Sequence, residues 1–238
     1  MSAVPGFRGD DYLLLVWGSG AYRADDLRLA VIDLRDPATW SYLRDMRSFP
    51  VGVLPVSYFA GLSGDTPLWS LHEEDARPLL WPGALGEISV RWVPQLRRYV
   101  LMAMAGPEDP IGKAVWMRVA RNPWGPWSRR RQVLDWILDG MGRRNGANHF
   151  IHDPDFNDGV GDCLFTQQCQ SGGAAYAPYL YDAKIVGDLA ILRYTLSTWN
   201  PYQVMLMQHE VRLAELQSLE LHLGSATFSE QPARTSVA

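Results

Sequence analysis

The polar and aromatic stretch from Ser197 to Tyr202 contains the residue types best suited to chemistry on a neutral ligand. Pro201 has no N–H to donate to a β-ladder, so one strand must end before it and another must begin after it. Aromatic faces beside amide and hydroxyl groups match the alternating apolar and hydroxylated surface of a sugar. We therefore predict that this corner binds such a ligand through Trp199, Asn200, Tyr202 and Gln203. The alternative is that Trp199 and Tyr202 only cap the edge of a sheet.

An acidic residue at the start of another predicted strand is the candidate for general acid catalysis. Glu87 follows Gly86, and strict alternation predicts that Glu87, Ser89 and Arg91 share one face of that strand. Burial at the mouth of a cleft raises the pKa of a carboxyl group, and a nearby arginine opposes that rise. Such a group can protonate a leaving group. The alternative is an ion pair along an exposed strand face.

Two further pairs of residues are predicted to contact the same ligand. Tyr176 and Tyr179 lie in a short aromatic strand before the corner, and Tyr22 and Arg23 lie in a loop between two early strands. With Arg91 they complete the predicted binding residues.

The sequence predicts no metal site and no cofactor. The segment HDPDFNDGVGD resembles a calcium loop, but Asp158 stands where the glycine belongs and Leu164 where the bidentate glutamate belongs. Cys163 and Cys169 are two ligands where a structural zinc site needs four. They are expected either to form a small disulfide or to remain free thiols.

Composition restricts the class of partner. Hydrophobic residues make up 47% of the 238 residues, which is ample for a folded core. The formal net charge of -4 argues against nucleic acid or an anionic membrane as a partner. The beginning of the chain, MSAVPGFRGDD, lacks the pattern of a signal peptide, and no apolar run is long enough to cross a bilayer. A neutral partner is expected.

The strand signals fall into three similar units, Tyr12–Leu80, Gly86–Leu138 and Tyr176–Leu213. Repeated small antiparallel sheets are typical of a β-propeller, and a two-sheet sandwich is the main alternative. We predict one all-β domain over residues 1–223 and a disordered tail over residues 224–238. Within it, Ser57–Gly61 is expected at a sheet edge, and the bend NPWGPWS is expected to pack its two tryptophans between sheets.

The strings GEISVRW, ARNPWGPWS, YAPYLYD and STWNPYQVMLM, in this order, resemble the family formerly catalogued as domain of unknown function 4185, now glycoside hydrolase family 183. The resemblance covers about Tyr12 to Val211. It implies a five-bladed β-propeller of the arabinanase kind and endo-cleavage of D-arabinan, the furanose polymer of mycobacterial arabinogalactan and lipoarabinomannan. Related propeller glycosidases place acidic residues around the central axis, so the resemblance implies that Glu87 is the acid.

The chain also departs from this family pattern. Five four-stranded blades usually need more chain, so an incomplete propeller of about three to four blades is expected. Hydrolysis of a glycosidic bond needs a second carboxylate. The candidates near predicted strand ends are Asp11, Asp25, Asp26 and Asp182, of which Asp182 is taken as catalytic. The resemblance suggests a secreted or cell-envelope location for a full-length form, and a cytoplasmic one is expected otherwise.

Two functions of different classes follow. The first is a glycoside hydrolase acting on an arabinan-like polysaccharide. The second is a non-catalytic or degenerate carbohydrate-binding propeller that keeps the aromatic corner and lacks a complete acid pair. The sequence does not indicate an oligomeric state.

Overall fold

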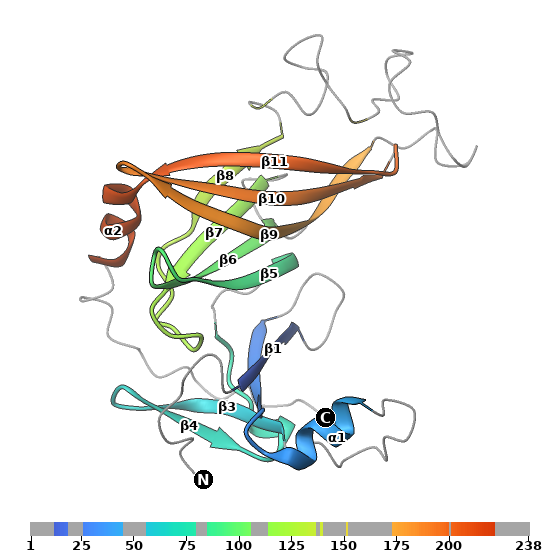
Figure 1. The fold of residues 1–238 in the computed structure, drawn as a ribbon, viewed down its shortest axis with the longest axis vertical. Coiled ribbons are helices and arrows are strands. Elements are labelled where there is room, and N and C mark those ends of the chain that lie inside the picture. The colour runs from blue at the N-terminus through green and yellow to red at the C-terminus, as the bar shows by residue number, and fades with distance from the viewer. Residues whose placement is uncertain are drawn as a thin grey trace, which may run out of the picture.

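The computed structural model describes residues 12–18, 26–44, 56–79, 85–105, 114–136, 139, 151, 173–199 and 201–221. Its strands form three antiparallel sheets that follow one another along the chain (Figure 1). Within each sheet, strands adjacent in sequence are also neighbours in space, so every connection inside a sheet is local.

The first sheet contains β1 (Tyr12–Gly18), β2 (Leu27–Asp33), β3 (Val56–Ser63) and β4 (Thr66–Ser70), in that order. The second contains β5 (Leu85–Val93), β6 (Arg98–Ala105), β7 (Ala114–Ala120) and β8 (Arg131–Asp135), also in order. The third has three strands, β9 (Ala174–Val186), β10 (Leu189–Trp199) and β11 (Gln203–Arg212), with β10 in the middle. Two α-helices, α1 (Pro37–Arg44) and α2 (Leu213–Leu221), and a 3-10 turn, η2 (Glu73–Asp75), complete the described elements.

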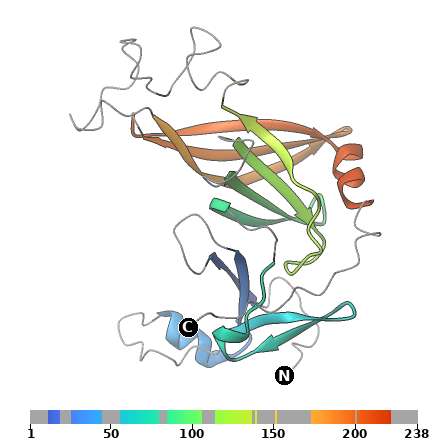
Figure 2. The same ribbon diagram turned by 180° about the vertical axis from the view of Figure 1, so that it is seen from behind.

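The second sheet lies between the other two, as both views show (Figures 1 and 2). Successive residues of β6 point to opposite faces of the sheet. Val100 and Met102 pack with the third sheet, whereas Tyr99 and Leu101 pack with the first. Both faces of the second sheet are therefore buried, which explains why β6 and β7 have almost continuous apolar sequences.

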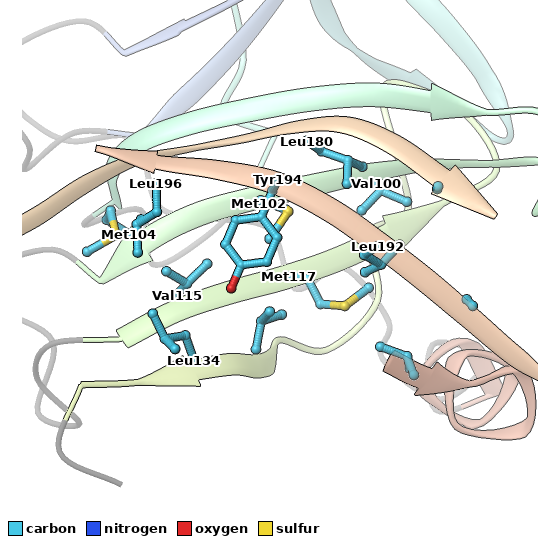
Figure 3. Close-up of a cluster of buried hydrophobic side chains, with 14 of the residues drawn as sticks. Val100, Met102, Met104, Val115, Met117, Leu134, Leu180, Leu192, Tyr194 and Leu196 are labelled. Atoms are coloured by element: carbon cyan, nitrogen blue, oxygen red, sulfur yellow. The ribbon is translucent and has the colours of Figure 1, made fainter. Parts of the chain in front are cut away.

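The largest cluster of buried side chains fills the space between the second and third sheets (Figure 3). Exposure alternates strictly along β10, whose residues from Ala190 to Thr198 are buried at every second position. Leu192, Tyr194 and Leu196 thereby face the methionines and valines of β6 and β7. Burial raises the pKa of Tyr194, so its hydroxyl group stays uncharged in the core.

The two tryptophans of the NPWGPWS bend pack between the first and second sheets, as predicted. Trp127 belongs to the cluster shared by these sheets, and Trp124 meets Trp69 of β4 edge to face, with ring centroids 6.2 Å apart. The bend turns at Gly125, which has a φ of 92°.

Several sequence predictions are confirmed and others are corrected. The three predicted units correspond to the three sheets. The predicted edge position of Ser57–Gly61 is wrong, because β3 pairs with β2 on one side and with β4 on the other. The stack has three layers where a sandwich has two, and a five-bladed propeller is not identified in the described part of the chain. Residues 224–238 lie outside the described residues.

Helix α2 is attached to the sheets by a charged cluster that sequence reasoning did not find. Arg131 of β8 donates to Glu215 of α2 at 2.7 and 3.1 Å, and its Nη1 lies 2.9 Å from Nε2 of His209 on β11. A guanidinium group can only donate, so this imidazole must accept and be neutral. Burial, followed by the charge of Arg131, lowers the pKa of His209, against the opposing effect of Asp139, Glu215 and Glu210.

This cluster predicts a pH dependence of stability. The pKa of His209 lies below 6.5 in the folded state, so protons bind more readily to the unfolded chain. The stabilisation is present in full above pH 6.5 and is lost as the pH falls through the lower, folded-state pKa. We expect His209→Gln, whose amide oxygen can also accept from Arg131, to have a flatter dependence of unfolding free energy on pH between 7 and 5. Urea titrations at several pH values test this. The exposed His72→Gln serves as the control, and equal slopes for wild type and His209→Gln would contradict the prediction.

The bend at Gly125 gives a second stability prediction. A Cβ atom at this position would lie 2.9 Å from the backbone nitrogen of Trp127 and would also require a residue other than glycine at positive φ. We expect Gly125→Ala to lower the unfolding free energy by about 2–3 kcal/mol. Gly64→Ala is the control, because its φ is also positive but its Cβ would meet nothing within 4 Å. That change should cost about 1 kcal/mol, and equal losses in urea titrations would rule out the steric contribution.

Candidate functional site

Strand β5 of the second sheet lies against β9 of the third, and one buried serine connects them. The hydroxyl group of Ser89 donates to the carbonyl oxygen of Pro178 at 2.8 Å and accepts from the N–H of Leu180 at 3.2 Å. At the far end of the same strands, Gln95 and Ile185 line one hollow of about 200 Å³. The strands β5 and β9 therefore run side by side in the same direction.

Glu87 lies near the start of β5 at an irregularity of the sheet. Leu85 pairs with Ala105 and Ile88 pairs with Ala103, so two residues of β5, Gly86 and Glu87, oppose one residue of β6. Such a β-bulge turns a side chain away from regular alternation. The predicted shared face therefore holds for Ser89 and Arg91 and is interrupted at Glu87, which is half-buried.

The outer face of the third sheet brings together residues that are far apart in the sequence. Tyr176 is opposite Ser197, Tyr179 is opposite Thr195, and Thr195 is opposite Leu206. Of these side chains, Tyr179 is 58% exposed and Leu206 is 76% exposed. We call this patch the outer aromatic face; it consists of Tyr176, Tyr179, Thr195, Ser197, Trp199, Val204 and Leu206.

The predicted corner adjoins this face. Strand β10 ends at Trp199, β11 begins at Gln203, and Pro201 lies in the turn between them, as expected. The hydroxyl group of Thr198 donates to the carbonyl oxygen of Pro201 at 2.8 Å and closes the turn. Gln203 and Tyr202 are exposed, and Trp199 is half-buried. Tyr176, Trp199, Tyr202 and Gln203 thus gather at one end of the third sheet.

Asp182 lies further along β9 and has a charged partner. Its carboxylate accepts from Nη1 of Arg193 at 2.9 Å, and Nε of Arg193 reaches Gln208 at 3.3 Å. Glu87 precedes Ser89 by two residues and Asp182 follows Leu180 by two. At about 3.3 Å per residue the two carboxylates are separated by about 13 Å along the strands. The structure does not bring them together.

Other predicted residues lie outside the described part of the chain. These are Tyr22, Arg23, Asn200, Asp11, Asp25, Cys163 and Cys169. Among the residues that the structure does describe, no group of three or more His, Cys, Asp or Glu side chains could hold a metal ion. No helix in those same residues is long and apolar enough to cross a membrane.

The Asp182–Arg193 pair gives a prediction about stability. Both side chains are about one third exposed, so solvent screens their attraction. A double-mutant cycle with Asp182→Asn and Arg193→Gln should give a coupling free energy of about 0.2–1 kcal/mol in urea titrations. A coupling free energy indistinguishable from zero would contradict the prediction.

Ser89 has a role in this region that the sequence did not predict. Its burial and its two hydrogen bonds to β9 make it the connection that fixes β5 beside β9. A serine alternating with apolar residues was the available signal, but its partners lie about 90 residues away in the chain.

Three antiparallel sheets, with an aromatic corner at the end of the third and an acidic residue near the start of the edge strand β5, define a mostly β protein. Comparison with known proteins establishes the family. The description "Domain of unknown function (DUF4185)" applies to residues 4–208, and the chain belongs to this family. No curated protein matches the chain.

A distant likeness exists among solved structures. One such structure is the crystal structure, at 2.80 Å resolution, of a protein from Bacteroides ovatus ATCC 8483 that carries the provisional name hydrolase. Its superposition on this chain has a TM-score of 0.48, and the two sequences are 12% identical. The match covers 90% of this chain and 45% of that one, so this chain spans less than half the length of the other protein.

Proposed function

We propose that this protein is a glycoside hydrolase that cleaves an arabinan-like polysaccharide, with Glu87 as the general acid. The sequence strings that resemble glycoside hydrolase family 183 support both the class and the substrate, and the chain belongs to DUF4185, the name under which that family was formerly catalogued. The observation that carries the proposal is Glu87 at the bulge near the start of β5, where β5 runs beside β9. We also propose that the three sheets are successive blades of the propeller type that this resemblance implies.

The position of Glu87 suits a proton donor in two ways. The bulge interrupts the regular alternation of β5 at Glu87. In the proposed mechanism the side chain would face the entrance between the second and third sheets. The side chain is half-buried, so it combines contact with protein and access for a substrate. In a general acid mechanism it would protonate the oxygen of the leaving sugar as the glycosidic bond breaks.

The substrate platform is the end of the third sheet closest to the start of β9. Tyr176 and Trp199 offer ring faces to the apolar side of furanose rings, and Tyr202 and Gln203 offer a hydroxyl and an amide group. Arg91, exposed on β5 two residues beyond Ser89, would donate to sugar hydroxyl groups. If the substrate is a polymer of the cell envelope, the enzyme must act outside the cell.

A carbohydrate-binding protein without catalysis is the second candidate, and one observation favours it. Paired carboxylates in glycosidases are about 5–9.5 Å apart. Asp182 is further than this from Glu87 along the strands and is engaged by Arg193. If no other carboxylate approaches Glu87, the platform would bind the polymer without cleaving it.

The variant Glu87→Gln separates these two functions. Under the proposal it lowers the rate of oligosaccharide release from arabinogalactan by about 10²-fold or more, because the amide cannot give up a proton. Binding to the polymer, measured by affinity electrophoresis, is expected to stay within about twofold of wild type because the platform is unchanged. Chromatography of the released oligosaccharides measures the rate.

The control is Glu210→Gln, which removes an exposed carboxylate from β11 and should leave turnover unchanged. Asp182→Asn tests the second carboxylate in the same assay, and a loss as large as that of Glu87→Gln would assign it a catalytic role. Full activity of Glu87→Gln would exclude this residue as the acid. Binding without turnover in the wild type would establish the second candidate.

A further inference from the structure

Helix α2 is connected to two strands through a single guanidinium group. Arg131 of β8 binds the Glu215 carboxylate of α2 through Nε and Nη2, at 3.1 and 2.7 Å. Its Nη1 lies 2.9 Å from Nε2 of His209 on β11. The guanidinium group is planar and rigid, so it cannot turn away from one of these partners without changing its contact with the other.

The packing beneath α2 is incomplete. Leu216 is buried in the core, and Leu213 and Leu219 pack partly buried beside it. A hollow of about 200 Å³ nevertheless remains under the helix, lined by Val119 of β7, Ile185 of β9 and residues of α2 itself. A nine-residue helix over a hollow loses fewer contacts on detachment than a helix over a close-packed core. Its release therefore costs less free energy than unfolding of the sheets.

The start of α2 is held independently of Arg131. The N–H of Leu213 donates to the carbonyl oxygen of Asp188, in the turn between β9 and β10, at 2.8 Å. Leu213 also directly follows the last residue of β11, and Figure 1 shows the helix at that end of the third sheet. Detachment of the rest of the helix would therefore leave the strands in place.

Protonation of His209 is incompatible with the contact to Arg131. An imidazolium ion has an N–H on both ring nitrogens, so Nε2–H would face an N–H of the guanidinium group. Two donors and two positive charges would then be in contact. The protonated state favours any rearrangement that takes Arg131 away from the ring.

The other ionisable groups near this ring are three carboxylates and one phenol, namely Asp139, Glu210, Glu215 and Tyr194. The carboxylates would attract an imidazolium ion. Burial and then the charge of Arg131 outweigh them, because the pKa of His209 is lowered overall. Burial keeps the phenol uncharged, and the residue of β10 directly opposite His209 is Leu192. Acid therefore weakens the arrangement in which α2 is attached.

We propose that α2 is a cover that is released by acid, with His209 as the group that binds the proton and Arg131 as its link to Glu215. When the ring gains a proton, the guanidinium group leaves it and the contact with Glu215 is lost. Helix α2 then detaches beyond its anchored start and opens the hollow beneath it to small apolar molecules. The release is local, so it differs from the pH dependence of global unfolding, and it does not depend on the hydrolase function.

Hydrogen exchange of the full chain at pH 7 and pH 5, measured by mass spectrometry and corrected for intrinsic exchange rates, tests the proposal. In the wild type, protection of the α2 amides should fall at least about fivefold at pH 5, while the amides of β6 and β7 keep their protection. His209→Gln should keep α2 protected, because its amide oxygen can accept from Arg131 at either pH. His72→Gln, at an exposed histidine, is the matched control and should behave as the wild type.

Glu215→Ala tests the link from the other side. It removes the carboxylate that Arg131 holds and keeps a residue with high helix propensity, so α2 should be poorly protected at both pH values. Wild-type protection of α2 in this variant would exclude the Arg131 contact as the attachment. Equal protection of α2 in the wild type at pH 7 and pH 5 would overturn the proposal.

The remaining outcomes distinguish this release from other effects of acid. Loss of protection in β6 and β7 together with α2 would show global unfolding and overturn the proposal. The same loss in His209→Gln would assign the effect to the carboxylates and exclude His209. Fluorescence of anilinonaphthalene sulfonate should rise at pH 5 with the wild type and stay low with His209→Gln. Release of α2 without this rise would exclude the hollow as the surface that is opened.

Discussion

The rest of this structure depends on the burial of the second sheet on both faces. Strands β6 and β7 carry apolar residues at consecutive positions, so neither face can be left in water without loss of hydrophobic stabilisation. Each fully buried side chain of the size of Leu101 or Met102 contributes about 1.5–3 kcal/mol relative to exposure. The first and third sheets are therefore drawn onto this sheet from opposite sides, and their own positions follow from it.

The constraint also determines where chemistry can take place. A strand packed between layers cannot offer polar side chains to a substrate except near its ends. Glu87 lies near the start of β5 and leaves the regular pattern at a bulge, whereas Ser89, two residues later, is already buried and bonded to the backbone of β9. Ser89 fixes the relative position of β5 and β9 at low energetic cost, since both of its hydrogen bonds are made. Any ligand held by Glu87 and the aromatic corner thus depends on a contact that itself touches no ligand.

The two outer sheets differ from the second in the way they use their faces. One face of each is in a core, and the other carries mixed apolar, aromatic and charged residues. On the third sheet this mixture is divided along the strands, with Tyr176 and Trp199 toward the corner and the Asp182–Arg193 pair further along. The cluster of Arg131, His209 and Glu215 holds α2 against the opposite end of the same sheet, so the charged and aromatic parts have separate roles.

The sequence by itself determined the local elements, which are the strands predicted from alternation and apolar runs, the corner at Pro201 and the three units that correspond to the three sheets. These features depend on residues close together in the chain. Only the tertiary structure decided that β3 is an inner strand, that Glu87 lies at a bulge, and that Asp182 pairs with Arg193 away from Glu87. The reason is physical: sheet order, bulges and ion pairs are set by which strands meet, and residues such as Ser89 and Leu180 meet across about 90 positions of sequence that no local pattern records.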